Sequence, residues 1–315
     1  MSTRVLHRGF VAAVAFVMLS VAAGAHAGLF RAYLSAKGSD ANPCTLAAPC
    51  RLLPAALAAV NDGGEIWMLD SANYNTATVS IAKSVTILAV PGALGSVLAP
   101  ANQRALLVNA VDVRVTVRNL VIVGANGTGT GIDLLNGAEL TVEDCEISML
   151  HIGIVAGASP LRPAKATLRN TVVRNNASIG VSVYGPTNAV LDGVRTTGND
   201  FGVYAQGGAS VNVTNSLIAH NRIGAQARAS ANNTQIVVGR STVTSNVTAL
   251  RVSAEVGGAG IVSDGNVITY ISGTVFEFDQ GPGGVTVIWT RNNNTLGYFN
   301  QDITPGHALT PLGVY

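Results

Sequence analysis

The chain has 315 residues, and only 11% of them are charged, with 19 Lys and Arg against 17 Asp and Glu. Such a balance argues against a basic surface for nucleic acid and against long-range attraction of a polyanion. The 35 glycines stand among many Val, Ile and Thr residues, which is typical of a chain rich in strands and tight turns rather than of disorder.

Residues 1–27 have the pattern of a secretory signal peptide. Arg4 and Arg8 form a basic start, residues 9–23 are an apolar run, and Ala25-His26-Ala27 matches a small-x-small cleavage site. The alternative, a membrane anchor, is less favoured because a span needs roughly 18 apolar residues. We therefore expect cleavage near Ala27 and export to the periplasm or beyond, with no membrane span in the mature chain. That mature chain would hold 17 basic and 17 acidic residues.

Residues 28–64 are predicted to form an N-terminal cap. Residues 52–60 are rich in Ala with apolar side chains at helical spacing, which predicts a short helix that could cover the open apolar end of a solenoid. In an exported protein, Cys44 and Cys50 are expected to form a disulfide that pins this cap, with two free thiols as the alternative. No His or third Cys stands near them, so we expect no metal there, and nothing in the chain indicates a cofactor.

Residues 65–315 are predicted to be one β-helix domain with a C-terminal tail. Between residues 115 and 273 a short phrase recurs seven times, first as Val117-Arg118-Asn119-Leu120-Val121-Ile122, at steps of 22 to 26 residues. A period of this size marks a solenoid. Mixed Val, Ile, Leu and Thr positions, without helical stretches between them, disfavour leucine-rich and helical repeats. The prediction is an all-β, right-handed parallel β-helix whose coils stack about 4.8 Å apart.

The repeat also assigns faces. A second mark follows the first six phrases: it is Gly-Ile or Gly-Val four times and then Gly224-Ala225 and Ala249-Leu250. Stacking by this mark gives two apolar columns that we expect to point inward. These columns are Ile132, Ile154, Val181, Val203, Ala225, Leu250 and Leu134, Ala156, Val183, Ala205, Ala227, Val252. Six of the third residues of the phrases are Asn or Asp and are expected to be turn-formers, because these residues tolerate positive φ; they are Asn119, Asp144, Asn170, Asp192, Asn215 and Asp264.

The residue after each turn-former is expected to point inward at a tight corner. This column comprises Leu120, Cys145, Thr171, Gly193, Ser216, Ser241 and Gly265. Cys145 is thereby predicted to be a buried core thiol rather than a reactive nucleophile, which would need a His or a basic group nearby.

Together with the segment Gly38-Ser39-Asp40-Ala41-Asn42-Pro43-Cys44 and the following Pro49-Cys50, this repeat resembles exported bacterial members of the pectate-lyase-like, right-handed parallel β-helix superfamily. The likeness covers nearly the whole mature chain. It implies the fold, but a fold hosts many functions. Enzymes of the superfamily are mostly polysaccharide lyases, hydrolases, esterases and epimerases that act in a groove along one sheet.

The residues for such chemistry are not evident on the strand that follows the Gly mark. Its outward columns contain one carboxylate, Asp133, whereas hydrolysis needs two and a calcium site needs several oxygens on one rim. Glu143, between Arg118 and Arg169 of adjacent coils, is predicted to form an exposed charge ladder. His151 and His220 are expected at turns. The chain is therefore interpreted as non-catalytic; if it is an enzyme, we expect a polysaccharide lyase or a glycoside hydrolase.

The same outward columns carry a polar and aromatic patch across four coils. Aromatic faces beside amide and guanidinium groups suit a shallow sugar-binding surface, although an ordinary solvated sheet face is the alternative. We therefore predict a protein that binds polysaccharide or cell-surface glycan along one sheet, with a carbohydrate-active enzyme or a structural adhesion module as alternatives. The patch comprises Tyr184, Tyr204, Gln206, Gln226, Arg228 and Arg251.

Overall fold

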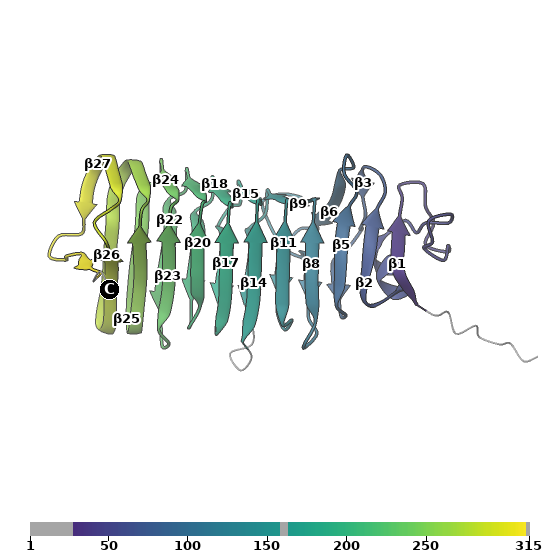
Figure 1. Ribbon diagram of the computed structural model, residues 1–315, viewed down its shortest axis with the longest axis horizontal. Helices are drawn as coiled ribbons and strands as arrows, with labels where there is room; N and C mark the ends of the chain where they lie inside the picture. Colours follow the sequence, from purple (N-terminus) through teal and green to yellow (C-terminus); the bar gives the residue numbers. More distant parts are fainter. Residues whose placement is uncertain (1–27, 158–162, 313–315) are drawn as a thin grey trace, which may run out of the picture.

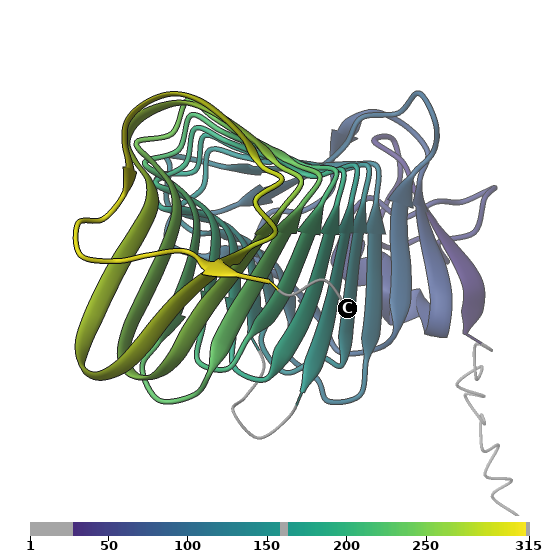
Figure 2. The same cartoon turned by 60° about the vertical axis from the view of Figure 1, so that its left-hand side comes forward.

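The strands wind into a right-handed solenoid of about ten turns, in which every described strand pair is parallel (Figure 1). The computed structural model describes residues 28–157 and 163–312, so the predicted signal peptide, residues 1–27, lies outside the described residues. Successive coils lie side by side along the whole length (Figure 2). The predicted fold class, an all-β right-handed parallel β-helix, is confirmed.

Each coil contributes strands to three sheets. The first sheet stacks β1 (Leu29–Leu34), β2 (Val60–Met68), β5 (Val85–Ala89), β8 (Arg114–Arg118), β11 (Glu139–Glu143), β14 (Ala164–Arg169), β17 (Thr187–Asp192), β20 (Ser210–Thr214), β23 (Thr234–Gly239), parts of β25 (Thr248–Asp264) and β26 (Val267–Thr290), and β28 (Thr310–Pro311).

The other two sheets are built in the same way, with the long strands β25, β26 and β27 bending from one sheet to the next. The second sheet stacks β3 (Ala72–Asn73), β6 (Gly95–Ala99), β9 (Leu120–Gly124), β12 (Glu146–Ser148), β15 (Val172–Arg174), β18 (Arg195–Thr197), β21 (Leu217–Ala219), β24 (Thr242–Thr244) and parts of β26 and β27 (Thr295–Ile303). The third stacks β4 (Val79–Ile81), β7 (Arg104–Val108), β10 (Thr130–Leu134), β13 (Ile152–Gly157), β16 (Ile179–Tyr184), β19 (Phe201–Gln206), β22 (Ile223–Ala229) and parts of β25, β26 and β27.

The core runs down the middle of the coils. All twelve residues of the two predicted inward columns are fully buried, and they pair in register from coil to coil on the third sheet. The alternation of apolar and polar residues therefore sets which face of this sheet is inside, because a strand directs successive side chains to opposite faces.

The corner between the first and second sheets needs one residue at positive φ in each coil. Asn119, Asp144, Asn170, Asn215 and Arg240 occupy it, with φ between 46° and 54°. The prediction was wrong by one position in two coils, where Gly193 and Gly265 take the corner. Glycine adopts positive φ without a Cβ clash, so the turn moves onto it and the preceding aspartate stays in the strand.

This shift also changes the buried column that follows the corner. Asp192 pairs with Arg169 and Thr214 as a strand residue, and Asp264 likewise pairs with Gly239. The buried members in those two coils are therefore Val194 and Asn266, not the predicted Gly193 and Gly265.

Cys145 belongs to this buried column, as predicted. It is 3% exposed, and burial raises the pKa of its thiol to about 12. Its thiol donates a weak hydrogen bond to the carbonyl oxygen of Glu143, which lies 3.2 Å from Sγ. A protonated, buried thiol cannot serve as a nucleophile, because the thiolate is the reactive form.

The corner between the second and third sheets holds a ladder of asparagines that the sequence reading did not predict. Its members, the asparagine ladder, are Asn176, Asn199, Asn221 and Asn246, each between 1% and 5% exposed. In each step the Oδ1 of one asparagine accepts from the backbone N and the Nδ2 of the asparagine one coil earlier, at 2.9 to 3.1 Å. The signal was present in the sequence, since these asparagines recur three or four residues before the mark that follows each phrase.

The glycine of that mark is required by this packing. A Cβ on Gly202 would lie 2.6 Å from the carbonyl oxygen of Gly224 and 3.0 Å from Nδ2 of Asn221. At Gly202 only glycine leaves room for the ladder and for the next coil, so the mark there reflects close approach rather than a binding site.

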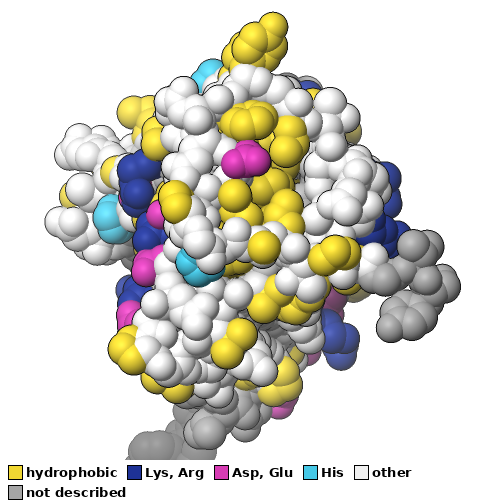
Figure 3. Space-filling view, turned by 90° about the vertical axis from the view of Figure 1, so that its left-hand side faces the viewer, with side chains coloured by type: hydrophobic (Ala, Val, Ile, Leu, Met, Phe, Trp, Pro, Cys, Tyr) yellow, Lys and Arg dark blue, Asp and Glu magenta, His cyan; other side chains and the backbone are white. Residues whose placement is uncertain are grey.

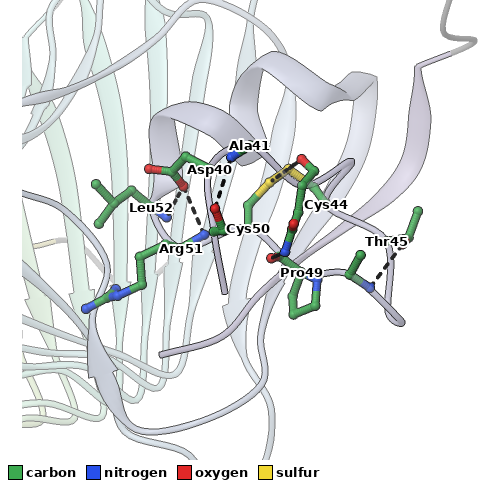
Figure 4. The surroundings of a disulfide bond; sticks show 11 residues. Asp40, Ala41, Cys44, Thr45, Pro49, Cys50, Arg51 and Leu52 are labelled. Carbon is green, nitrogen blue, oxygen red and sulfur yellow. Dashed lines mark hydrogen bonds between the residues drawn. A yellow bond between two sulfur atoms is a disulfide. The ribbon is translucent and has the colours of Figure 1, made fainter. Parts of the chain in front are cut away.

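The N-terminal end is closed by a small cap. Helix α1 (Leu53–Ala59) buries Leu53, Ala56 and Leu57 against the first coil. Cys44 and Cys50 form a disulfide, and Oδ1 of Asp40 accepts from the backbone N of Arg51 and of Leu52 at 2.9 and 2.8 Å (Figure 4). Because β1 pairs with β2, the segment 28–64 contributes a strand to the stack as well as the covering helix.

The C-terminal end of the solenoid differs from the N-terminal end because hydrophobic side chains are exposed on it. Figure 3 shows hydrophobic side chains gathered at the middle of this end around one acidic side chain, with most charged side chains at its flanks. Strand β27 pairs with β26 on one side, and Leu296, Tyr298 and Phe299 remain exposed on it. None of the helices in the described ranges is both long and apolar enough to span a membrane.

Candidate functional site

The outward face of the third sheet carries the six predicted patch residues. Tyr204, Gln226 and Arg251 follow one another in register, and Ser182 precedes them in the same outward column. A second outward column, one alternation further along the strands, contains Tyr184, Gln206, Arg228 and Ser253. The pairing thus brings the six residues into two adjacent columns of one sheet, in which Tyr204 and Gln226 are largely buried.

Both columns continue into one more coil than the sequence reading followed. In β26, Glu277 pairs with Arg251 and Asp279 pairs with Ser253. These two carboxylates were missed because the regular phrase ends before them. The alternation Phe276-Glu277-Phe278-Asp279 was the signal, since both phenylalanines are buried and both acids point outward.

A hollow of about 400 Å³ opens over these columns and is lined by residues of β19, β22, β25 and β26. We call it the Arg251 pocket. It is lined by Phe201, Tyr204, Gln226, Arg228, Arg251, Ser253, Ala254, Glu255, Asp279 and Gly281. Four of the six predicted patch residues line it, while Tyr184 and Gln206 lie beside it on the same face.

The charged groups of the pocket are paired with one another. Nη2 of Arg251 lies 2.8 Å from Oδ2 of Asp279, and Nε of Arg251 lies 3.5 Å from Oε1 of Glu277. Arg228 donates a short hydrogen bond from Nη2 to Glu255, and this bond raises the pKa of the Arg228 guanidinium above its ordinary value. Both guanidinium groups are thus oriented by carboxylates of this chain.

Aromatic rings form the apolar wall. The Tyr204 ring meets Phe201 and Tyr184 edge to face, with centroids 5.4 and 6.2 Å apart. Tyr204 is only 7% exposed and donates its hydroxyl to Oε1 of Gln206 at 2.8 Å. Burial raises the pKa of Tyr204, so the ring carries a neutral hydroxyl at physiological pH.

One outward column concentrates polar atoms that lack partners. Five buried side-chain N or O atoms of the described residues have no hydrogen-bond partner, and three of them, Ser182 Oγ, Gln226 Oε1 and Arg251 Nε, belong to this column. The Arg251 Nε is near Glu277 without the geometry of a hydrogen bond. A buried polar atom without any partner costs about 1–3 kcal/mol, and in this column that description applies to Ser182 Oγ and Gln226 Oε1.

The other groups considered from the sequence are otherwise engaged. Glu143 lies between Arg118 and Arg169, 3.0 Å from Nε of the first and 3.4 Å from Nη1 of the second, as the predicted row requires. Asp133 is held by Arg104. Across residues 28–157 and 163–312, no three His, Cys, Asp or Glu side chains are grouped so that they could hold a metal ion.

Comparisons with known proteins agree with this architecture. The family described as right handed beta helix region matches residues 104–297, more than half of the chain. No curated protein matches the sequence.

Two solved structures illustrate the likeness. The crystal structure of pectate lyase Pel9A aligns with a TM-score of 0.66 at 18% identity, covering 90% of this chain and 78% of that one. The A-module of the Azotobacter vinelandii mannuronan C-5 epimerase AlgE6 aligns with a TM-score of 0.50 at 14% identity, covering 80% and 90%. At such identities the likeness concerns the fold.

Proposed function

The chain belongs to the right-handed β-helix family, and we propose that it is an exported, non-catalytic member that binds polysaccharide or cell-surface glycan in the Arg251 pocket. The observation that carries this proposal is the lining of the pocket, in which two aromatic side chains stand beside an amide and two guanidinium groups. Such a mixture of ring surface and polar groups on one face is what a sugar-binding surface needs.

The chemistry of the wall favours a sugar. A sugar ring presents an apolar C–H face and a rim of hydroxyl groups, which can donate and accept. Tyr204 and Phe201 offer ring surface for the apolar face, and Arg228 and Arg251 offer donors beside the amide of Gln226. The pocket opens onto a continuous sheet face, which suits a polymer better than an enclosed small molecule.

The fold relatives support the same class of partner. By their names, pectate lyase acts on pectate and mannuronan C-5 epimerase acts on mannuronan. A solenoid of this shape can therefore present a polysaccharide-sized surface, although these names carry no residue of this chain into a catalytic role.

One observation favours a second function, glycoside hydrolysis, because Glu277 and Asp279 stand in neighbouring outward columns. Hydrolysis needs one carboxyl group to deliver a proton and another to act as base or nucleophile. Here Arg251 contacts both groups, and Glu255 is bound by Arg228. Carboxylates committed to arginines fit an oriented binding surface better than proton transfer.

A binding screen with a product readout tests the proposal. The protein purified without residues 1–27 is mixed with neutral and acidic polysaccharides, with and without calcium, and depletion, unsaturated products and new reducing ends are recorded. We expect at least one polysaccharide to bind and no products to form. If products form, the proposed binding function is wrong and the protein is a hydrolase or a lyase. If neither binding nor products are found, the structural adhesion module is the remaining function.

Two substitutions locate the bound site. Tyr184→Ala and Tyr204→Ala should each weaken binding by about tenfold, since a central aromatic side chain commonly carries more than 1 kcal/mol of binding free energy. Tyr33→Ala is the matched control, because Tyr33 also meets a ring edge to face, Trp67 at 6.3 Å, but lies on the first sheet. If all three variants bind equally well, the binding site does not lie on this face of the third sheet.

Export is tested separately. Expressed from its full sequence in a Gram-negative host, the protein should be recovered outside the cytoplasm with an N-terminus near Gly28. Recovery in the cytoplasm with residues 1–27 intact would contradict this part of the proposal.

A further inference from the structure

We infer that the chain holds a second glycan subsite on its first sheet, where Trp289 is the platform for an uncharged sugar ring of the same glycan that occupies the Arg251 pocket. This inference deepens the proposed function and rests on it. It is carried by a groove around Trp289, by the uncharged lining of that groove, and by its place across one corner from the Arg251 pocket.

The groove has a volume of about 410 Å³, and Ser210, Gln235, Gly260, Val287 and Trp289 are among the residues that line it. We call it the Trp289 groove. The first four of these residues pair in register through β20, β23, β25 and β26. The residue that follows each of them along its strand is buried, so alternation directs this column to the outward face of the first sheet.

The indole ring of Trp289 lies over Gly260. A Cβ on Gly260 would lie 2.9 Å from Cη2 of the ring, so only glycine lets the ring rest against the sheet here. Gly260 is buried although its column faces outward, whereas Trp289 remains partly exposed. The ring is therefore held in place by the fold and still offers surface to a ligand.

The lining of the Trp289 groove differs in charge from that of the Arg251 pocket. None of the residues that line the groove is charged, whereas two arginines and two carboxylates line the pocket. A charged ligand group would lose water in the groove without gaining an ion pair, so the groove suits an uncharged group. Indole surface beside polar groups fits the apolar face and the hydroxyl rim of a sugar ring.

Three polar groups of the groove are not used by the fold. The hydroxyl of Ser210, the side-chain amide of Gln235 and the indole N–H of Trp289 make no hydrogen bond within the described residues. Together they can donate to and accept from sugar hydroxyls. Asn233, which also lines the groove, differs from them because its Oδ1 accepts from the backbone N of Gly258 at 2.8 Å.

The Trp289 groove and the Arg251 pocket lie on either side of the corner between the third and first sheets. Strand β25 bends at this corner and contributes Glu255 to the pocket and Gly258 to the groove. Strand β26 likewise contributes Gly281 to the pocket and Val285 to the groove. Three residues span at most about 10 Å, so one glycan chain can cross the corner and occupy both sites. Two linked sites bind one polymer more tightly than either site alone.

Tryptophan fluorescence tests the groove directly, because Trp67 and Trp289 are the two tryptophans of the chain. In Trp67→Phe the signal comes from Trp289 alone. This variant, purified without residues 1–27, is titrated with a soluble mixed-linkage β-glucan, a galactomannan and a methyl-esterified homogalacturonan. We expect the polymer that binds to shift the emission of Trp289 and to reduce its quenching by acrylamide about twofold, with the midpoint found by depletion.

Substitutions test whether one chain occupies both sites. Trp289→Ala should weaken binding by about tenfold, and Tyr204→Ala in the Trp67→Phe protein should weaken the fluorescence response to a similar extent. Trp67→Ala is the matched control, because Trp67 lies on the first sheet at the other end of the solenoid, and it should leave the affinity unchanged. The fluorescence titration keeps the indole ring in place, so it decides the matter even if Trp289→Ala folds poorly.

The outcomes separate this inference from the function on which it rests. If a polymer binds, Tyr204→Ala weakens it and the emission of Trp289 does not change, the second subsite is overturned while the proposed function stands. If the emission changes but Tyr204→Ala binds like wild type, the shared chain and the Arg251 pocket are both wrong. If no polymer binds, both proposals fail.

The protein alone provides a last check. An emission change of Trp289 on concentrating the Trp67→Phe protein without polymer would show that a second copy of the chain covers the groove, and would overturn the inference. Constant emission over the same concentrations, together with a response to polymer that both Tyr204→Ala and Trp289→Ala weaken, supports it.

Discussion

Asn199 and Gln226 are buried amides in neighbouring coils, and their surroundings are opposite. In the asparagine ladder, Oδ1 of Asn199 accepts from N and Nδ2 of Asn176, and its Nδ2 donates to Asn221 and to the carbonyl oxygen of Val173. In the Arg251 pocket, Oε1 of Gln226 accepts from nothing. All four hydrogen bonds of the first amide are made within the fold, whereas the oxygen of the second has no hydrogen-bond partner.

The two regions also differ in how they repeat. The ladder recurs in four coils with the same geometry, as a solenoid needs if each coil is to stack on the next. The outward column changes at every coil, from Ser182 to Tyr204, Gln226, Arg251 and Glu277. Residues that repeat in every coil, such as the ladder asparagines, serve the stacking of the coils. The candidate site lies where the residues on a regular sheet face differ from coil to coil.

The largest change in the free energy of unfolding is expected when one amide of the asparagine ladder is removed. Asn199→Ala removes four hydrogen bonds and leaves several buried groups unpaired, so we expect the free energy of unfolding to fall by about 3 kcal/mol. Denaturant unfolding measures this change. Asn212→Ala is the control, because Asn212 is exposed on the first sheet and should change stability by no more than about 0.5 kcal/mol. Similar losses in the two variants would show that the ladder has no special role.

A smaller change in the free energy of unfolding, and of opposite sign, is expected when Gln226 in the Arg251 pocket is replaced. Gln226→Leu keeps the size of the side chain and removes the unpartnered oxygen, so the unfolding free energy should rise by about 1 kcal/mol. The same denaturant experiment applies. A loss of more than 1 kcal/mol would mean that Gln226 is used by the fold after all, and the contrast with Asn199 would collapse.

The smallest change in the free energy of unfolding is expected for the exposed ion pairs that Glu143 forms with Arg118 and Arg169. The hydrogen bond from Arg118, supported by Arg169, lowers the pKa of Glu143 below its ordinary value of 4.5. A lowered pKa stabilises the fold above the unfolded-state pKa, and this contribution is lost as pH falls through the folded-state value. Wild type should therefore exceed Glu143→Gln in unfolding free energy at pH 7, by at most about 1 kcal/mol because both arginines are about half exposed.

That difference should shrink as pH falls below the ordinary pKa of 4.5, since Glu143 becomes protonated as pH passes through its lowered pKa. Thermal or denaturant unfolding of the two proteins across this range measures it. A difference that stays constant with pH would show that the row of charges contributes through packing alone.

Much of the fold could be predicted because its causes are local and periodic. The inward columns follow from strand alternation alone, and every residue assigned to them is buried. The corner was misplaced at Asp192 and Asp264 because the sequence pattern ranks Asn and Asp as turn-formers, whereas the glycine that follows costs less at positive φ.

The site was predicted in part for the same reason. Tyr204, Gln226, Arg228 and Arg251 lie in the regular part of the repeat, so alternation placed them on one face. Glu277 and Asp279 lie after the last phrase, where the register could not be carried forward from spacing. Which polar atoms lack partners depends on distances between coils, and no sequence pattern contains them.

The central claim is that Gln226 serves a ligand and not the fold. The most direct measurement is calorimetric titration of wild type and Gln226→Leu with the polysaccharide that binds best in the screen. The account predicts that the variant binds at least about tenfold more weakly while being at least as stable as wild type. Equal affinity in the two proteins would contradict it.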